Sequence, residues 1–576
     1  MFKTQNFEKR NSTINTRISF LFLVIIVSAI VFTTQLFMKS VWQHDTLVAL
    51  AKDQYIVEKK LPYERGNIYV KDDKYPGGYF PLALSQDRYQ ILVVPKNVKD
   101  YRKTAKIISE IIGQDENKIY EKINNDKLYI PPVAKNLEKN KADEILKSNL
   151  EGVMIATEQS RLYPEDDLAS QVIGFVDAEG IGRYGIEGYY NSELTGKSGE
   201  ISAEKDILGR FISIGNQIDP EDGSHIYSTI DRNIQYISQR YLKRAISEME
   251  AENGEIIIID PNTGKILSMA STPGFNPNTY YETAEEHPDY FGNSVISNVW
   301  EPGSIMKPIV MSMAIDLGKV EPDTKDNFGG SVTIQGYTIR NAMDRTFGNE
   351  TMTKVLENSD NIAMTWLGKK MSDEEMYNYF NNYGFGRVSN IDLGGEASGH
   401  MLDLPDWREI SHATMTFGQG ISATPLQMVM AYGALANGGK LMKPYMVDKI
   451  VKSNGEEINI TPEEQGQVIK KETSQKIKEM LVSVVDNGYD LQGKVEGYKI
   501  AGKTGTAQIP NKSGGYEEND FIHSFIGFFP ADNPKYAMLI VLEKPKKFNF
   551  ASSTCAPYFS QIARWLLNYS ETNPES

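Results

Sequence analysis

The chain has 576 residues, of which 40% are hydrophobic and 10% aromatic, a composition typical of folded globular proteins. This length predicts two or three domains, because single hydrophobic cores stop growing at about 250–300 residues. Acidic residues outnumber basic ones by 76 to 61, giving a net charge of −15 that argues against a nucleic-acid partner. The histidines show no metal-ligand spacing, so we expect no metal and no cofactor. The single cysteine, Cys555, excludes an internal disulfide, and we expect it to pack as a small apolar residue.

An uncharged apolar segment, ISFLFLVIIVSAIVFTTQLFM, covers residues 18–38. As a helix it would span roughly 31 Å, enough to cross the hydrocarbon of a bilayer. Its length and the lack of a small-residue cleavage site after it favour an uncleaved anchor over a signal peptide. The basic residues that precede it favour an anchor over a buried core helix and predict a cytoplasmic N-terminus: Lys3, Lys9, Arg10 and Arg17. Beyond the membrane there is no ATP supply, so the chemistry must use energy stored in the substrate.

The pattern of the chain changes near residue 225. Before it, short strands such as Gln90–Val94 alternate with charged helical segments over 101–113 and 136–148. After it come a strand (HIYSTI), an amphipathic helix (IQYISQRYLKRAISEME) and a hairpin (GEIIIIDPNTGKILSMAS). Two late strand segments, KIAGKTGTAQ and SFIGFFPADNPKYAMLIVLEKP, precede a C-terminal helix that starts at PYFSQIARWLLNY. Strands at both ends of a helical middle predict an α+β fold, with a sheet built from both chain ends.

Ser304 and Lys307 lie three residues apart in WEPGSIMKP. On a helix this spacing puts the hydroxyl and the amine on one face, one turn apart. It suits a serine nucleophile whose proton is accepted by an amine instead of a histidine. Ser304 also follows Pro302 and Gly303 at a plausible helix start, so it could be an N-cap, and the two roles are compatible.

Two further motifs follow in the chain, Ser359-Asp360-Asn361 in LENSDNIAM and Lys503-Thr504-Gly505 in YKIAGKTGTAQ. Each alone would be an ordinary polar turn or strand. Residues 497–504 also match the phosphate-binding pattern G-x-x-x-x-G-K-T, but a P-loop needs a buried strand before it and a helix after it. The flanking segments here are polar and turn-like, so we reject that interpretation.

The ordered trio S-x-x-K, S-D-N and K-T-G is the signature of penicillin-binding proteins and class A β-lactamases. Other stretches occur in the order found in one family: RGNI (65–68), RLYPEDDLASQVIGFV (161–176), GRYGIEGYYNSELTGKSGE (182–200), TPGFNPN (272–278), GFGRVSNIDLGGEASG (384–399) and GQGISATPLQ (418–427). With these motifs the chain resembles the class B penicillin-binding proteins, single-pass peptidoglycan D,D-transpeptidases, over most of its length.

The resemblance implies an α+β fold in four parts. Residues 1–17 would be a cytoplasmic tail and 18–38 the transmembrane helix. Residues 39–224 would form an elongated, mixed α/β, non-catalytic pedestal (dimerisation-like) domain. Residues 225–576 would form the penicillin-binding transpeptidase domain, with a central antiparallel sheet flanked by helices.

The implied reaction is acyl transfer on the D-Ala-D-Ala end of a peptidoglycan stem peptide. Ser304 attacks the penultimate carbonyl, the terminal D-Ala leaves, and the amine of a second stem peptide captures the acyl-enzyme. β-Lactams would acylate the same serine. By resemblance Lys307 accepts the serine proton, Ser359 relays a proton to the leaving nitrogen, and Asn361 hydrogen-bonds Lys307 and the substrate amide.

The K-T-G segment is implied in substrate binding. Lys503, Thr504 and Thr506 would hold the terminal carboxylate, and Gly505 would let the substrate approach as an added strand. The backbone N–H groups of Ser304 and Thr506 would form the oxyanion hole. Lys307 must be neutral to act, although the pKa of a lysine is ordinarily about 10.4. Partial burial and a second cation would lower that pKa, and Lys503 is the candidate cation.

Several alternatives remain within this interpretation. The total length and the nucleophile near residue 300 favour a division-specific enzyme over an elongation enzyme, although both types share every motif above. The chain could instead act mainly as a scaffold that activates a membrane glycan polymerase. A secreted β-lactamase would have no use for the anchor or pedestal, and a penicillin sensor would need a signalling domain. The partners implied are stem peptides, β-lactams, a membrane glycan polymerase and division or elongation proteins.

Overall fold

The structure is a computed structural model that describes residues 5–48, 56–205, 211–511 and 515–574. The chain forms two compact units. One unit combines Met1–Tyr63 with Gly196–Asp222, and the other combines Glu64–Thr195 with Gly223–Ser576. Each unit is therefore made of two segments that are distant in the sequence.

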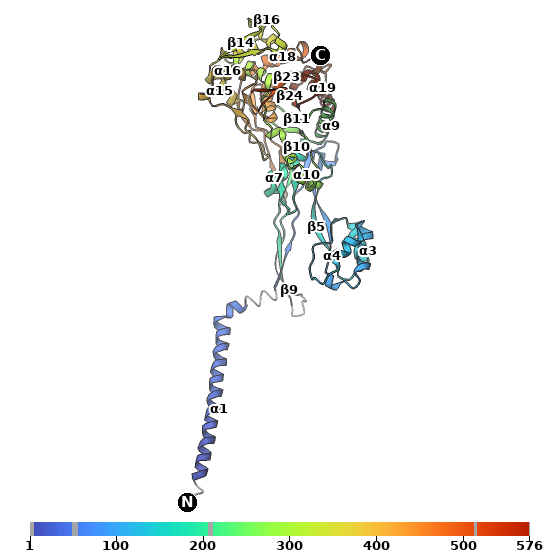
Figure 1. Cartoon of the computed structure of the whole chain (residues 1–576), viewed down its shortest axis with the longest axis vertical. Coiled ribbons are helices and arrows are strands. Elements are labelled where there is room, and N and C mark those ends of the chain that lie inside the picture. The colour runs from blue at the N-terminus through green and yellow to red at the C-terminus, as the bar shows by residue number, and fades with distance from the viewer. Residues whose placement is uncertain (1–4, 49–55, 206–210, 512–514, 575–576) are drawn as a thin grey trace. The chain divides into compact units, whose positions relative to one another are not determined.

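The first unit contains a long helix, α1 (Gln5–Phe37), which continues into a π-helical turn, η1 (Met38–Trp42), and is drawn in dark blue in Figure 1. Within it, Asn15–Trp42 is long and apolar enough to cross a membrane, with a mean hydropathy of 2.5 and no buried part. The predicted span 18–38 lies inside this segment. The unit also holds an antiparallel sheet of three strands: β1 (Ile56–Leu61), β8 (Gly199–Lys205) and β9 (Phe211–Ile218).

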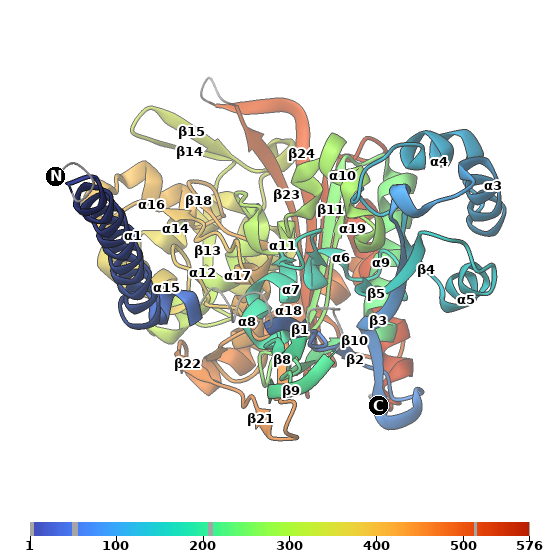
Figure 2. The same cartoon turned by 90° about the horizontal axis from the view of Figure 1, so that it is seen from below.

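A five-stranded antiparallel sheet is the centre of the second unit. In spatial order its strands are β12 (Ile266–Thr272), β11 (Asn253–Ile259), β25 (Tyr536–Glu543), β24 (Tyr516–Phe529) and β23 (Ala501–Pro510). Figure 2 shows green β11 near the orange strands β23 and β24 from the other end of the chain. The prediction of a sheet built from both chain ends is confirmed.

Helices cover both faces of this sheet. One face carries α9 (Arg232–Met249) and α19 (Ala551–Tyr569), and the other carries α11 (Ser294–Ser297) and α17 (Pro425–Ala436). The side chains of β11 alternate accordingly, because successive residues of a strand point to opposite faces. Ile256 and Ile258 join the core beneath α9 and α19, whereas Ile257 and Ile259 join the larger core around α17. A sheet buried on both faces explains the nearly continuous hydrophobic run GEIIII.

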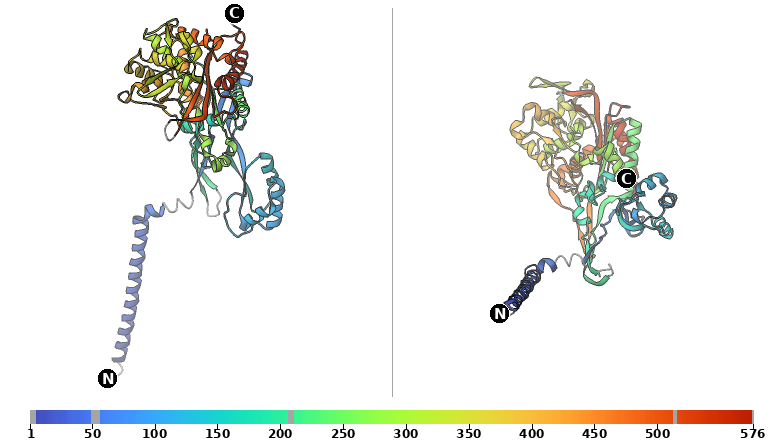
Figure 3. Two further views of the ribbon diagram at one scale, coloured as in Figure 1. Left: turned by 45° about the horizontal axis from the view of Figure 1, so that its top comes forward. Right: turned by 60° about the horizontal axis from the view of Figure 1, so that its bottom comes forward.

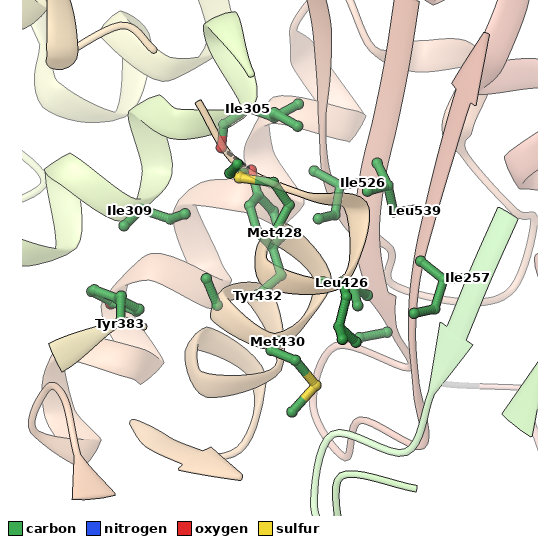
Figure 4. Packing of buried hydrophobic residues seen from close by; sticks show 14 of the residues in the cluster. Ile257, Ile305, Ile309, Tyr383, Leu426, Met428, Met430, Tyr432, Ile526 and Leu539 are labelled. Atoms are coloured by element: carbon green, nitrogen blue, oxygen red, sulfur yellow. Dashed lines mark hydrogen bonds between the residues drawn. The ribbon is translucent and has the colours of Figure 1, made fainter. Parts of the chain in front are cut away.

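Helix α17 connects this sheet to the turn that carries Ser304. Thr424 caps its N-terminus in a capping box with Gln427, and every residue of the helix is buried. Figure 4 shows its side chains packed between strands and neighbouring helices. The hydroxyl of Tyr432 donates to the backbone oxygen of Ile305 at 2.8 Å. This bond fixes the backbone next to Ser304 from within the core.

The middle of the chain supplies the remaining helices and several short hairpins. The helices are α10 (Tyr280–Glu286), α12 (Lys307–Asp316), α13 (Met352–Asn358), α14 (Asn361–Gly368), α15 (Asp373–Asn382), α16 (Glu409–Met415) and α18 (Lys471–Asn487). The hairpin strands are β13 (Lys325–Phe328) with β16 (Gly348–Thr351), β14 (Ser331–Ile334) with β15 (Tyr337–Arg340), β17 (His400–Met401) with β18 (Ile421–Ser422), and β19 (Lys440–Met442) with β22 (Glu464–Gln467).

A second, mixed sheet of the same unit joins its two sequence segments. Its strands are β21 (Glu457–Asn459), β20 (Val447–Val451), β10 (His225–Asp231), β2 (Ile68–Lys71), β3 (Tyr79–Val93) and β4 (Ala134–Leu137), with β5 (Val153–Leu162) also paired to β3. Strand β10 pairs in parallel with β2 and antiparallel with β20. A domain boundary after residue 224 would thus assign two neighbouring strands of one sheet, β2 and β10, to different domains. The predicted boundary stays a prediction.

Strands β3, β4 and β5 of this sheet carry a small helical cluster with its own core. It contains α3 (Tyr101–Ile112), α4 (Glu116–Ile123) and α5 (Lys139–Lys147), which match the helices predicted at 101–113 and 136–148 and add α4. In both views of Figure 3 these light-blue helices lie beside one another. Further short helices, α6 (Ser170–Ile173), α7 (Gly185–Tyr189) and α8 (Asn191–Leu194), and a bridge of β6 (Phe175–Val176) with β7 (Gly182–Arg183), complete the unit.

Candidate active site

Ser304 lies in a 3₁₀ turn, η6 (Gly303–Met306), and Lys307 is the first residue of α12. The nucleophile candidate therefore sits at the start of a helix, as the sequence predicts. Two glycines shape this turn: Gly303 has φ +58°, and its N–H donates to the backbone oxygen of Gly418 at 3.0 Å. A Cβ on Gly418 would lie 2.2 Å from the Gly303 oxygen, so the two backbones touch only because residue 418 has no side chain.

The S-D-N segment forms a sharp corner between α13 and α14. Ser359 adopts the left-handed conformation, with φ 57°, and thereby ends α13. Asp360 caps α14, because its carboxylate accepts the N–H of Ala363 at 2.8 Å. This corner presents the side chains of Ser359 and Asn361 on the same side, towards Lys307.

Hydrogen bonds connect the first two motifs. The amine of Lys307 is 2.6 Å from the backbone oxygen of Ser359, 3.0 Å from Ser359 Oγ and 2.7 Å from Asn361 Oδ1. Ser359 Oγ is in turn 3.0 Å from Ser304 Oγ. Lys307 is thus linked to the nucleophile candidate through the Ser359 hydroxyl. The amide of Asn361 has a fixed orientation, because its Nδ2 donates to the backbone oxygen of Arg340 at 2.9 Å.

The pKa of Lys307 is lowered far below its usual value. Burial is the main cause, since the side chain is inaccessible to solvent, and the positive charge of Lys503 adds to it. The Asp360 carboxylate acts in the opposite direction. These are the two causes, burial and Lys503, that the sequence suggests, and together they favour the neutral amine.

The K-T-G segment lies on β23, an edge strand that pairs with β24 along one side. The N–H of Thr504 points to the other side, where it donates to Asp490 at 3.0 Å. Because N–H directions alternate along a strand, the N–H of Thr506 points to the same open edge. A Cβ on Gly505 would lie 2.4 Å from Ser524 Oγ and 3.1 Å from the Ile305 side chain. The steric need for glycine at 505 thus comes from the protein's own packing.

Asp490 was not found by sequence reasoning. Its carboxylate forms an ion pair with Lys503, at 3.2 Å, and accepts the Thr504 hydroxyl at 2.5 Å. It lies in DNGYDLQGKVE, which as a sequence has only the character of a polar turn. A partner 13 residues away across such a turn leaves no periodic signal, so the pair becomes visible only in the fold.

A cavity of about 840 Å³ brings the three motifs together. The predicted site residues in its lining are Ser304, Ser359, Asn361, Lys503, Thr504 and Thr506. Lys307 lies buried behind this wall and reaches it through Ser359. Both charges and aromatic rings line the rest of the cavity, including Arg340, Arg345, Glu301, Tyr489 and Phe521.

The comparisons with known proteins agree with this geometry. The family model "Penicillin binding protein transpeptidase domain" matches residues 254–564, and "Penicillin-binding Protein dimerisation domain" matches residues 60–228. Stage V sporulation protein D of Bacillus subtilis is 32% identical over 567 residues, which cover 96% of this chain and 86% of that protein. Peptidoglycan D,D-transpeptidase FtsI of Escherichia coli is 29% identical over 505 residues, covering 86% of this chain and 83% of the other.

Solved structures show the same fold. A peptidoglycan synthetase from Bifidobacterium adolescentis superposes with a TM-score of 0.72 at 25% identity, covering 90% of this chain and 98% of that one. Penicillin Binding Protein 2X from Streptococcus thermophilus superposes with a TM-score of 0.74 at 23% identity, over 90% of this chain and 83% of that one. The motifs, the two matched domains and these relatives agree, and the chain belongs to the class B penicillin-binding proteins.

Proposed function

We propose that this protein is a membrane-anchored peptidoglycan D,D-transpeptidase that works through an acyl-enzyme on Ser304. The observation that carries the proposal is the continuous hydrogen-bond chain from Ser304 through Ser359 to Lys307, a lysine whose pKa is strongly lowered. A serine next to a neutral amine is an activated nucleophile. The open edge of β23 beside it can receive an extended peptide as an added strand.

The network suits a neutral lysine. A neutral amine has two N–H donors and one lone pair, and Lys307 has two fixed acceptors, the Ser359 backbone oxygen and Asn361 Oδ1. Its lone pair is then left for the Ser359 hydroxyl, which can rotate to donate or accept. In the attack, the Ser304 proton passes to Lys307 by way of this hydroxyl. The same hydroxyl returns the proton to the nitrogen of the departing D-Ala.

Charge that develops on the substrate carbonyl oxygen is stabilised by backbone donors. We assign this role to the N–H groups of Ser304, at the start of η6, and Thr506, on the open edge of β23. One such donor is worth roughly 3–4 kcal/mol in hydrolases. Lys503, Thr504 and Thr506 bind the terminal carboxylate. An amine of a second stem peptide then captures the acyl group, so one peptide bond replaces another.

We propose that the N-terminus lies in the cytoplasm and the transpeptidase part beyond the membrane. The basic residues that precede the apolar segment support this orientation: Lys3, Lys9, Arg10 and Arg17. The partners proposed are a membrane glycan polymerase, which supplies new strands, and division proteins. The similarity to FtsI of Escherichia coli supports septal over side-wall synthesis. A fluorescent fusion that formed rings at division sites would support the septal role, and uniform side-wall fluorescence would contradict it.

The acyl-enzyme is tested by labelling with a fluorescent penicillin. We expect the wild-type protein to carry the label and Ser304→Ala to carry none, with equal thermal stability. Ser297→Ala, on α11 and outside the cavity lining, is the matched control and should label like the wild type. Labelling of Ser304→Ala, or a folded wild type that takes no label, would overturn the proposal.

A further inference from the structure

Lys503, the cation expected to bind the substrate carboxylate, already has a carboxylate partner. The side chains of Lys503 and Asp490 are only 2% and 1% exposed, and they form an ion pair at 3.2 Å. A charge without compensation is costly at such depth, whereas a paired one is tolerated. In the free protein, Lys503 is therefore already paired with an internal carboxylate.

The surroundings of Asp490 resemble a carboxylate-binding site that the protein fills itself. Its Oδ2 accepts hydrogen bonds from the Lys503 amine and the N–H of Thr504, and its Oδ1 accepts one from the Thr504 hydroxyl at 2.5 Å. An ammonium, a hydroxyl and a backbone N–H are the donors that recognise a ligand carboxylate. Thr506 is different, because its Oγ1 accepts the N–H of Ala551 at 3.2 Å and keeps its own proton to donate.

We propose that Asp490 is a specificity-determining internal counter-ion, which lowers the preference of the site for ligands that carry a carboxylate. A ligand carboxylate must share Lys503 and the Thr504 hydroxyl with Asp490 and brings a second negative charge beside it. A ligand without a carboxylate meets no such repulsion. Asp490 touches the binding groups and none of the reacting atoms, so it acts through Lys503 and Thr504.

The proposal predicts the effect of removing one charge while keeping the shape. In Asp490→Asn the side-chain oxygen still accepts the N–H of Thr504, but Lys503 has lost its counter-ion. A ligand carboxylate can then take the place of Asp490 as the ion-pair partner of Lys503. The interaction energy of two charges in contact exceeds the energy that corresponds to a tenfold rate ratio, even at an effective dielectric constant of about 20. The preference for an anionic ligand should therefore rise about tenfold or more.

This inference rests on the proposed acyl-enzyme function, and the probes are benzylpenicillin and its methyl ester, which differ only in the carboxylate. In both reactions a bond forms between Ser304 Oγ and the lactam carbonyl carbon, the lactam C–N bond breaks, and the serine proton ends on the released ring nitrogen. The product mass is the sum of protein and ligand. Intact-protein mass spectrometry of the full chain in detergent gives the acylation rate constant for each probe.

The measured quantity is the ratio of the rate constants for the acid and the ester. A ratio at least tenfold higher in Asp490→Asn than in the wild type would support the proposal. Asp392→Asn is the matched control, because Asp392 is also a hydrogen-bonded carboxylate, but it is half-buried and accepts the Tyr190 hydroxyl and the N–H groups of Met446 and Val447. Its ratio should equal that of the wild type, which separates a loss of stability from a change in specificity.

An unchanged or lower ratio in folded Asp490→Asn would overturn the proposal and leave the acyl-enzyme function intact. If neither probe acylated the wild type, the proposed function itself would fail. Should Asp490→Asn not fold, Asp490→Ser leaves a hydroxyl acceptor and room for water beside Lys503. If that variant also did not fold, Asp490 would be a purely structural residue and the inference would be wrong.

Discussion

At the scale of single residues, Lys307 gains its chemistry from where it lies. A lysine in water is almost fully charged at neutral pH, whereas burial and the charge of Lys503 lower the pKa of Lys307 far below the usual value. Only the neutral form accepts a proton. The acylation rate should therefore rise with pH while Lys307 deprotonates and level off well below pH 10, the ordinary range for a lysine. A rate that kept rising up to about pH 10.4 would show an ordinary lysine instead.

Replacing the amine tests the same residue directly. Lys307→Met keeps a long apolar chain but cannot accept the serine proton, so acylation by penicillin should fall by about 10²–10⁴-fold, the usual contribution of a general base. Lys369→Met, at an exposed position at the end of α14, is the control and should acylate normally. If folded Lys307→Met kept more than a tenth of the wild-type acylation rate, Lys307 would not be the general base.

Glu255 is a second buried residue with an altered pKa, and it lies outside the cavity lining. Burial, with the nearby Glu543 carboxylate, raises the pKa of Glu255 from 4.5 to about 7. The unfolded chain releases this proton near pH 4.5, whereas the folded chain holds it until about pH 7. The contribution of Glu255 to the free energy of unfolding is therefore fully present below pH 4.5. About 3 kcal/mol of it is lost as the pH rises to 7.

Glu255→Gln should remove this loss. The amide stays neutral and can still accept from Asn298, which lies 3.3 Å from Glu255 Oε1. The thermal stability of the variant relative to the wild type should thus rise between pH 4.5 and pH 8. Glu285→Gln, at an exposed position, should show no such trend. A difference between variant and wild type that does not change with pH would contradict the assignment.

At the scale of elements, the position of η6 depends on two backbones in contact. Gly418 has φ +82°, and an added Cβ would lie 2.2 Å from the Gly303 oxygen, so Gly418→Ala must push η6 and Ser304 away. We expect acylation to slow by tenfold or more, since small displacements of a nucleophile are costly, by about 10²-fold for 1 Å. Gly318 is the control: it also has positive φ, +69°, but open space around it. Gly318→Ala should lower stability by about 1 kcal/mol through backbone strain and leave acylation unchanged.

Local sequence patterns predicted many elements well. The helix at 234–250 is found as α9, and the hairpin around Asn262–Gly264 as β11 and β12. The C-terminal helix starts earlier than predicted, at Ala551 instead of Pro557. Proline in a helix interior costs about 3 kcal/mol, which is why it suggests a helix start. Here the burial of the whole face of α19 against the sheet, from Cys555 to Leu567, outweighs that cost.

The candidate site could be predicted to the extent that its residues form short motifs. Ser304, Lys307 and Ser359 are visible because a fixed spacing or an ordered set marks them. The role of Asp490 in the site, and the raised pKa of Glu255 outside it, depend on contacts between segments that are separated in the sequence. No local spacing reveals such contacts. The sequence placed the hydroxyl of Ser304 and the amine of Lys307 on one helix face, and the left-handed turn at Ser359 brings a second hydroxyl into hydrogen-bond reach of both.

At the scale of the whole molecule, the five-stranded sheet and the mixed sheet of the second unit depend on pairing between distant parts of the chain. Strand β11 pairs with β25, and β10 pairs with β2 and β20. The transpeptidase sheet therefore cannot close until the C-terminal residues are present, and loop closure over such lengths adds an entropic cost. Composition and periodicity predicted that both chain ends meet in one sheet, but the second, mixed sheet across the predicted boundary was not foreseen.

Membrane orientation is the last property of the whole molecule, and the single cysteine makes it testable. Cys555 is fully buried, and burial raises the pKa of its thiol to about 12, so a maleimide should not label the folded wild type. Labelling of a protein with one introduced cysteine would then come from that cysteine and not from Cys555. In intact cells stripped of wall, a membrane-impermeant maleimide should label Ser453→Cys, in an exposed turn after β20, and should label Ser12→Cys only after permeabilisation. The reverse pattern would place the transpeptidase part in the cytoplasm and exclude peptidoglycan as its substrate.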